Sequence, residues 1–316
     1  MMKIYDLVII GAGPAGLSAG IYAGRAMLDT LIIEQGQDGG QIVQTAEIEN
    51  YPGSELEESG ATLIDRMTAQ VKKFGIEKAY DTVKEISFEG KVKTINCDRG
   101  SYQAKTVIIA GGASAKPIGC IGEEEFLGRG ISHCGTCDGP FFKGLHVLVV
   151  GGGDAALEEA LYLTKFARKV TVIHRRRVLR AAKLIQEKAF KNEKIDFMYH
   201  TVIKEVRGDG LLESMTLENV KDGTVTEIKA DPNDGTFGIF VFIGYKPATE
   251  SYQGKLNLNE KGYIITDADM KTNVDGVFAA GDIREKSLRQ VITAAADGAI
   301  AAVQAGKYIE DMDETV

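Results

Sequence analysis

Short apolar runs that end at glycine recur along this chain, and each predicts a buried β-strand. One run covers residues 5–10 and ends at Gly11, and a second covers residues 146–150 and ends at Gly151. Each is followed by a stretch whose apolar positions have helical spacing. The order strand, glycine turn, helix predicts two units of the Rossmann type.

Further apolar runs complete both units. Residues 30–33 end at Glu34 and residues 169–173 end at His174, so each predicts the second strand of a unit. The runs at 106–110 and 238–243 close on glycine and are predicted to be the points where the chain crosses between domains. A strand over 272–282 and an Ala-rich helix from about 289 to 308 follow. Alternating segments at 83–88, 91–96, 202–207 and 213–217 predict antiparallel strands that cap each parallel sheet.

The predicted fold is therefore α/β, with two Rossmann-like nucleotide-binding domains of three-layer ββα architecture. Residues 118–245 are expected to be inserted within a domain made of residues 1–117 and 246–316. With 316 residues the chain is long enough for two domains of ordinary size.

The two glycine turns share one pattern and begin at Gly11 and at Gly151. A pyrophosphate can rest there against free backbone N–H groups and the positive end of a helix dipole. One such match is weak, but two in one chain predict two bound dinucleotides. The turns consist of Gly11, Ala12, Gly13, Pro14, Ala15 and Gly16, and of Gly151, Gly152, Gly153, Asp154, Ala155 and Ala156.

The residue that ends the second strand distinguishes the two nucleotides. Glu34 ends this strand in the first unit, where a carboxylate suits a ribose diol and repels a 2′-phosphate. His174 has the same spacing from Gly151 as Glu34 has from Gly11, and basic residues follow it: Arg175, Arg176, Arg177 and Arg180. Guanidinium groups match phosphate oxygens. The first site is thus predicted to bind FAD or NAD and the second NADPH, with a solvated basic turn as the alternative.

The cysteines point to redox chemistry. Of four cysteines, Cys134 and Cys137 form a Cys-x-x-Cys pair, and Cys97 and Cys120 are interpreted as structural or incidental. Zinc remains a minor alternative because a second ligand pair is absent, so no metal site is predicted. Asp138, directly after the pair, is the candidate acid/base group, with helix capping as its alternative role.

Charge and hydropathy indicate which partners and which location to expect for this protein. The net charge of −8 argues against nucleic acid. No apolar run approaches the roughly 20 residues that span a bilayer, and a predicted strand at Ile4 leaves no room for a signal peptide. A cytoplasmic protein without membrane contact is expected.

Residues 132–139 (Ser-His-Cys-Gly-Thr-Cys-Asp-Gly) are closely similar to the Cys-Ala-Thr-Cys-Asp-Gly box of a known family. Residues 39–41, 49–53, 174–176 and 289–290 fit the same pattern. The whole chain thus resembles the low-molecular-weight, bacterial-type thioredoxin reductases. This resemblance implies FAD in the outer domain, NADPH in the inserted one, thioredoxin as electron acceptor, a homodimer and an inter-domain rotation that alternately presents nicotinamide and disulfide to the flavin.

The same resemblance implies individual contacts. One stretch would line the FAD, with Asn50 close to the flavin: Glu34, Gln35, Gly36, Gln37, Asp38, Gly39, Gly40 and Gln41. Others would hold the ribityl chain and ring: Gly281, Asp282, Arg289, Gln290 and Val291. Arg175, Arg176 and Arg180 match the family's 2′-phosphate ligands. Arg177 and His133 depart from the family pattern; His133 either lowers a thiol pKa or is merely tolerated.

Three other functions compete with this interpretation. A ferredoxin-dependent enzyme of the same build is expected to lack the second glycine turn or the arginines, and this chain has both. A peroxiredoxin reductase component would carry an additional N-terminal disulfide domain. A non-catalytic flavin-binding sensor would not need both the hydride-donor site and the thiol pair.

Overall fold

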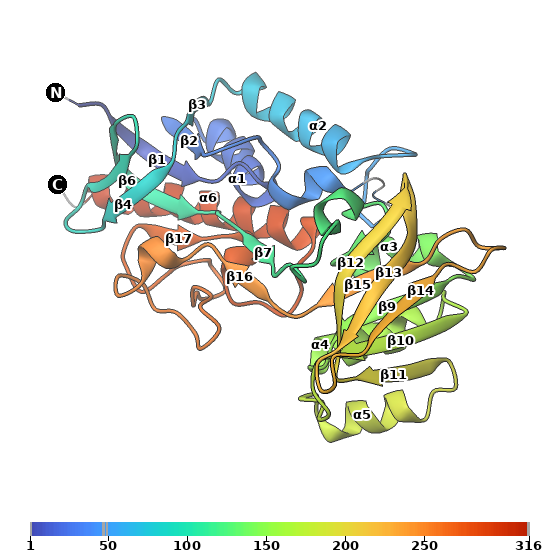
Figure 1. Cartoon of the computed structure of the whole chain (residues 1–316). Coiled ribbons are helices and arrows are strands. Elements are labelled where there is room, and N and C mark those ends of the chain that lie inside the picture. Colours follow the sequence, from blue (N-terminus) through green and yellow to red (C-terminus); the bar gives the residue numbers. More distant parts are fainter. Residues whose placement is uncertain (1, 46–47, 49, 315–316) are drawn as a thin grey trace. The chain divides into compact units, whose positions relative to one another are not determined.

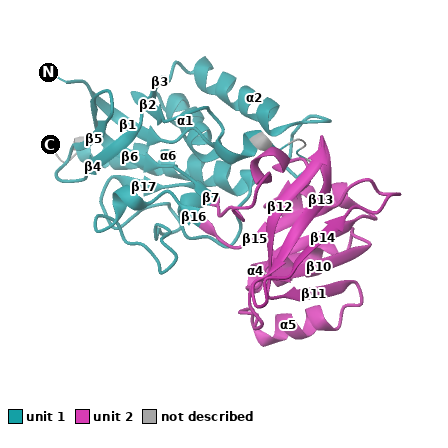
Figure 2. Ribbon diagram, in the orientation of Figure 1, with its two compact units in different colours: residues 1–114, 246–316 teal, residues 115–245 magenta. Residues whose placement is uncertain are grey.

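The computed structural model divides the chain into two compact units (Figure 2). It describes residues 2–45, 48 and 50–314. Unit 1 comprises residues 1–114 and 246–316, and unit 2 comprises residues 115–245. The first crossing lies slightly before the predicted boundary, at residue 115 instead of 118. Two short strands next to the crossings, β7 (Ala113–Ala115) and β16 (Tyr245–Pro247), pair with each other.

Unit 1 is built on a seven-stranded sheet of order β3-β2-β1-β6-β5-β4, in which β17 also pairs with β6 (Figure 1). Its strands are β1 (Ile4–Ile10), β2 (Thr30–Glu34), β3 (Glu77–Tyr80), β4 (Val83–Ser87), β5 (Lys93–Cys97), β6 (Ser101–Ile109) and β17 (Val277–Ala279). Its long helices are α1 (Pro14–Arg25), α2 (Gly60–Lys73) and α6 (Val291–Glu314). Short 3₁₀ turns, η1 (Gly40–Gln44), η4 (Glu250–Tyr252) and η5 (Gly281–Ile283), complete it.

Alternation along the strands gives unit 1 a core on each face of its sheet. Leu7 and Ile9 of β1 belong to the cluster that α1, α2 and α6 cover. Val8 and Ile10 belong to the opposite cluster, with Ile86 of β4 and buried side chains that follow residue 250. Because neighbouring side chains of a strand point to opposite faces, a continuous apolar run is what a sheet covered on both sides requires.

Unit 2 has a five-stranded parallel sheet of order β11-β10-β9-β15-β8. Its strands are β8 (Ile131–Ser132), β9 (His146–Gly151), β10 (Lys169–His174), β11 (Ile195–Tyr199) and β15 (Gly238–Phe242). Helices α4 (Asp154–Leu163) and α5 (Lys183–Phe190) cover one face. The antiparallel sheet of β12 (Thr201–Asp209), β13 (Leu211–Asn219) and β14 (Val225–Lys229) covers the other. The short turns are η2 (Glu123–Phe126), α3 (Gly135–Asp138) and η3 (Gly139–Phe142). This is the predicted ββα layering.

Two local predictions differ from the structure. In unit 1 the antiparallel strands β4 and β5 extend the edge of the parallel sheet and do not cap it, because β5 pairs with the first half of the long strand β6. The strand expected over residues 272–282 is reduced to β17. Gly276, with φ of +73°, turns the chain back there, and Thr272 N–H bonds the carbonyl of Val277 across the turn.

The packing of α6 against α1 generates a stability prediction. A Cβ on Gly298 of α6 would lie 2.0 Å from the backbone oxygen of Ala15, so Gly298→Ala must separate the helices. We expect a loss of about 2 kcal/mol in the free energy of unfolding of unit 1, measured by urea denaturation. Gly306→Ala on the same helix is the matched control. Its Cβ meets only Leu28 at 3.9 Å, so it should be neutral or slightly stabilising. Equal effects of both substitutions would contradict this account.

Candidate nucleotide and disulfide sites

The turn between β1 and α1 leaves no room for a side chain at Gly11 or Gly16. Gly11 has φ of +106°, and a Cβ there would lie 2.5 Å from the carbonyl oxygen of Ala110. A Cβ on Gly16 would lie 1.8 Å from the carbonyl oxygen of Gly11. Helix α1 begins after Gly13 with no side-chain cap and has Pro14 in its first turn. The N-terminal amides are therefore available to an anion, which fits a pyrophosphate.

Glu34, predicted to bind a ribose, also braces this turn. Its carboxylate accepts the N–H of Ala12 at 2.7 Å and the N–H of Gly36 at 2.9 Å. Each bond uses one oxygen, and a carboxylate oxygen has a second lone pair for a hydroxyl donor. The side chain therefore ties the end of β2 to the glycine turn while it keeps acceptor capacity.

Two other residues of the predicted flavin-lining stretch, Asp38 and Gln41, are held by contacts with the protein. Asp38 forms an ion pair with Lys78 and lies 3.3 Å from the hydroxyl of Thr68, although its other oxygen is buried without a partner among the described residues. Gln41 donates through Nε2 to the carbonyl of Ala113. Part of this stretch is thus held by protein contacts.

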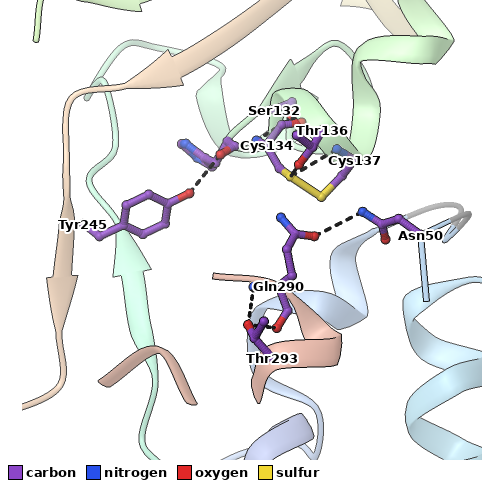
Figure 3. Close-up of a disulfide and its surroundings, with 9 residues drawn as sticks. Asn50, Ser132, Cys134, Thr136, Cys137, Tyr245, Gln290 and Thr293 are labelled. Carbon is purple, nitrogen blue, oxygen red and sulfur yellow. Dashed lines mark hydrogen bonds between the residues drawn. A yellow bond between two sulfur atoms is a disulfide. The ribbon is translucent and has the colours of Figure 1, made fainter. Parts of the chain in front are cut away.

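The structure brings together Asn50 and Gln290, which lie near opposite ends of the chain. Asn50 donates through Nδ2 to Oε1 of Gln290 at 3.1 Å (Figure 3). Thr293 holds the start of α6 beneath this pair, because its Oγ1 accepts the backbone N–H of Gln290 at 3.2 Å. Two residues predicted to lie near the flavin therefore meet at one place in unit 1.

Buried polar groups mark the region at the start of α6. Oδ1 of Asp282 and Nε of Arg289 are both buried without a hydrogen-bond partner within the described part of the chain. Burial raises the pKa of Asp282. Arg289 stacks on Tyr263, with Cζ 4.2 Å from the ring centroid. Buried polar atoms are nearly always satisfied, so an acceptor and a donor left open fit a bound polar molecule. Asp282 suits hydroxyl groups, which agrees with a ribityl chain.

Sequence reasoning missed Asp297, which organises this region. It is 7 % exposed, accepts the N–H of Gly281 at 3.0 Å and pairs with Lys286 at 2.7 Å and Arg284 at 3.3 Å. The turn that presents Asp282 is therefore anchored to α6. The only sequence clue was an acid inside an otherwise Ala-rich helix.

The second glycine turn repeats the design of the first in unit 2. A Cβ on Gly151 would lie 2.6 Å from the carbonyl oxygen of Phe242, and α4 begins after Gly153 without a side-chain cap. Asp154 faces the following loop and accepts the N–H of Ala182 at 2.7 Å. Ala155 is exposed in the first helical turn and Ala156 is buried. The amide-lined helix start fits a second pyrophosphate.

His174 and the arginines after it have distinct roles in the structure. His174 is 6 % exposed and lies under the glycine turn, where a Cβ on Gly152 would be 2.4 Å from its ring. Burial lowers its pKa, and the nearby arginines act in the same direction. Arg175, Arg176, Arg177 and Arg180 are exposed, and among the described residues none forms an ion pair. The backbone N–H of Arg180 bonds Gly152 at 2.6 Å, which holds this basic loop beside the turn.

Cys134 and Cys137 form a disulfide at the start of the short helix α3, with their Cα atoms 5.3 Å apart (Figure 3). Sγ of Cys134 accepts the N–H of Cys137 at 3.2 Å and lies 3.3 Å from Oγ1 of Thr136. Ser132 binds the backbone of Cys134 through its hydroxyl, which accepts the N–H at 3.0 Å. After reduction, the N–H of Cys137, together with the hydroxyl of Thr136, would favour a thiolate on Cys134.

Asp138 lies directly after the pair and is partly buried. Burial raises the pKa of its carboxyl, opposed by a hydrogen bond with Ser132 and by the charge of His133. The His133 ring lies 3.4 Å from the carbonyl of Val241, and its own carbonyl accepts the hydroxyl of Tyr245 at 2.8 Å. A carboxyl that holds its proton more tightly than usual is suited to protonate a departing thiolate. The backbone N–H of Asp138 bonds Cys134, so it also belongs to the turn that carries the disulfide.

Across the described ranges, no helix is long and apolar enough to cross a membrane. In the same residues, no group of three or more His, Cys, Asp or Glu side chains is arranged to hold a metal ion.

Comparison with known proteins identifies the family of this chain. Residues 5–298 match the family model described as pyridine nucleotide-disulphide oxidoreductase. The chain is 59 % identical to a thioredoxin reductase of Peptoclostridium litorale, over 99 % of both chains, and 57 % identical to one of Peptoclostridium acidaminophilum, over 98 % of both. The solved thioredoxin reductase of Streptococcus pyogenes superposes with a TM-score of 0.93 at 45 % identity, covering 98 % of this chain and 100 % of that one. This chain belongs to the pyridine nucleotide-disulphide oxidoreductase family and, within it, to the low-molecular-weight thioredoxin reductases of bacterial type.

Proposed function

We propose that the protein is an NADPH-dependent thioredoxin-disulfide reductase with FAD in unit 1 and NADPH in unit 2. The proposal rests on one observation. The chain combines the Cys134–Cys137 disulfide with two helices that each begin at a glycine turn and have no side-chain cap. Two nucleotide sites and one thiol pair are the parts that a hydride-to-disulfide relay needs.

In unit 1, the amides of α1 would bind the pyrophosphate of FAD and Glu34 its ribose. The open oxygen of Asp282 would accept a ribityl hydroxyl, and Arg289 and Gln290 would contact the ring. Bound FAD supplies a two-electron carrier between hydride donor and disulfide. The residues proposed to contact it are Gly11, Gly13, Pro14, Ala15, Gly16, Glu34, Gln35, Gly36, Gln37, Asp38, Gly39, Gly40, Gln41, Asn50, Gly281, Asp282, Arg289, Gln290 and Val291.

In unit 2, the start of α4 would bind the pyrophosphate of NADPH, and the exposed arginines would bind its 2′-phosphate. His174 lies under the glycine turn, and burial lowers its pKa. Unlike Glu34 in unit 1, it brings no carboxylate that would repel a 2′-phosphate. The proposed contacts are Gly151, Gly153, Asp154, Ala155, Ala156, His174, Arg175, Arg176 and Arg180.

The reduced Cys134–Cys137 pair would then exchange with the disulfide of thioredoxin. Two electrons and two protons open the Cys134–Cys137 bond to a dithiol. One thiolate attacks the partner disulfide, a mixed disulfide forms, and the second thiol displaces the reduced partner. Asp138 would donate a proton to the sulfur that leaves and recover one in the reverse direction.

Both crossings between the units are short, and they pair through β7 and β16. The disulfide must receive electrons and also reach a protein substrate. We therefore propose that unit 2 rotates about these crossings during turnover. A homodimeric state and a cytoplasmic location stay predictions that rest on the family resemblance. A ferredoxin-dependent reaction is not favoured, because the second glycine turn and its arginines are both present.

The basic loop predicts nucleotide selectivity. Replacing Arg175, Arg176 and Arg180 together by Gln removes the groups proposed to hold the 2′-phosphate. We expect KM for NADPH to rise about 1,000-fold or more, because three charge-assisted contacts are lost and each costs about 1.5 kcal/mol or more, while KM for NADH changes little. Steady-state kinetics with both nucleotides measures this. Lys191→Gln, an exposed cation after α5, should leave both values unchanged. Parallel losses with NADPH and NADH would refute the assignment.

Asp138 predicts a pH dependence. Burial raises its pKa, so the proton-donating form persists to higher pH than for an ordinary carboxyl and is lost as pH rises through that raised pKa. Asp138→Asn should lower thioredoxin reduction about 100-fold and remove this limb from the pH–rate profile, with flavin reduction by NADPH unaffected. Asp209→Asn, an exposed acid of unit 2, is the control. A wild-type profile in the Asp138→Asn enzyme would rule out the proton-transfer role.

A further inference from the structure

Residues 134–139, called the redox turn below, carry the disulfide. The carboxyl of Glu159 on α4 lies against this turn. Its Oε2 is buried and has no hydrogen-bond partner among the residues described. A Cβ built on Gly135 would lie 2.0 Å from this oxygen and 3.2 Å from the carboxyl carbon. The carboxyl therefore fills the space that a side chain at position 135 would occupy, against the backbone that follows Cys134.

Helix packing holds Glu159 in this place. Leu163, one turn further along α4, would contact the same Cβ of Gly135 at 3.8 Å and a Cβ on Gly139 at 3.1 Å. Gly135 and Gly139 are four positions apart, as are Glu159 and Leu163, so the redox turn rests on one face of α4. The turn and the carboxyl belong to one packed contact inside unit 2.

The surroundings disfavour a negative charge at this contact. Burial raises the pKa of Glu159, and the charge of Glu158 on the same helix raises it further. The ionisable groups of the facing segment are His133, Asp138 and the two cysteines, and the pKa of Asp138 is raised as well. When the disulfide opens, a thiolate adds a second negative charge to this region. An ionised Glu159 and the thiolate therefore repel each other.

We propose that Glu159 is a positioning residue that couples reduction of the Cys134–Cys137 disulfide to uptake of a proton through its contact with Gly135. Two electrons break the S–S bond, and one proton from solvent gives a thiol and a thiolate. Where Glu159 is ionised in the oxidised protein, a further solvent proton binds its carboxylate. The proposal rests on the proposed redox role of the pair, yet it concerns the thiol equilibrium alone.

The test is the midpoint potential of the pair as a function of pH. The full-length protein is equilibrated in dithiothreitol redox buffers, and the oxidised fraction is read from alkylation and peptide mass. This measurement needs neither NADPH nor thioredoxin. A failure of the proposed enzyme activity would therefore leave its result unaffected, and the two failures are distinguishable.

Glu159→Gln keeps the size and removes the ionisation. At the acid end of the titration, where Glu159 is protonated, variant and wild type should have the same potential. At the alkaline end the variant disulfide should be reduced about tenfold more readily, a shift of about 30 mV, because no carboxylate opposes the thiolate. Glu187→Gln, an exposed acid of α5, should match wild type at both ends. Superimposable curves, or one constant offset at every pH, would overturn the proposal.

Gly135→Ala tests the contact independently. Its Cβ would displace the end of a flexible side chain rather than backbone, so the fold should tolerate it. With the carboxyl moved away from the turn, the potential at high pH should shift in the same direction as for Glu159→Gln. A wild-type pH dependence in the Gly135→Ala protein would show that the contact does not transmit the effect.

Discussion

The whole arrangement depends on how closely a helix N-terminus approaches the end of a β-strand. In unit 1 a single added carbon at position 16 would come within 1.8 Å of the carbonyl oxygen of Gly11, and in unit 2 one at position 151 would come within 2.5 Å of the Cβ of Ala156 in α4. Glycine is the residue that permits such approaches. The same turns leave both helices without a side-chain cap, so backbone amides remain for a phosphate. Close packing and anion binding are thus two consequences of one backbone geometry.

Several carboxyl groups of this protein are buried, where a negative charge is unfavourable. Asp282, Asp138 and Glu159 come from different elements, and burial raises the pKa of each. Oxygens of Asp282 and Glu159 also lack a partner among the described residues. Asp297 provides the contrast, because it is buried but neutralised by Lys286 and Arg284. Asp297, which holds a turn in place, is ion-paired, whereas Asp282, Asp138 and Glu159 form no ion pair with Lys or Arg among the described residues. This distribution is typical of functional sites.

Local pattern was sufficient for the fold and for much of the candidate sites. Each glycine turn and its flanking strands form one short continuous segment, so the spacing to Glu34 and to His174 could be counted. Features that depend on tertiary contacts were not predicted from the sequence. The strand over 272–282 was overestimated because the pattern does not show the turn at Gly276. The ion pair of Asp38 with Lys78 joins segments that helix α2 separates in the sequence, and Glu159 meets Gly135 across strand β9 and the second glycine turn. No sequence period encodes such pairs.

In the proposed reaction, electrons from NADPH reach a protein disulfide only through Cys134 and Cys137. The most direct measurement is an anaerobic titration of the FAD-loaded Cys137→Ser variant with NADPH, followed by addition of oxidised thioredoxin. We expect the flavin absorbance of the variant to be bleached as in wild type. Thioredoxin should then stay oxidised, whereas the wild-type protein reduces it. Rapid reduction of thioredoxin by Cys137→Ser would contradict the relay.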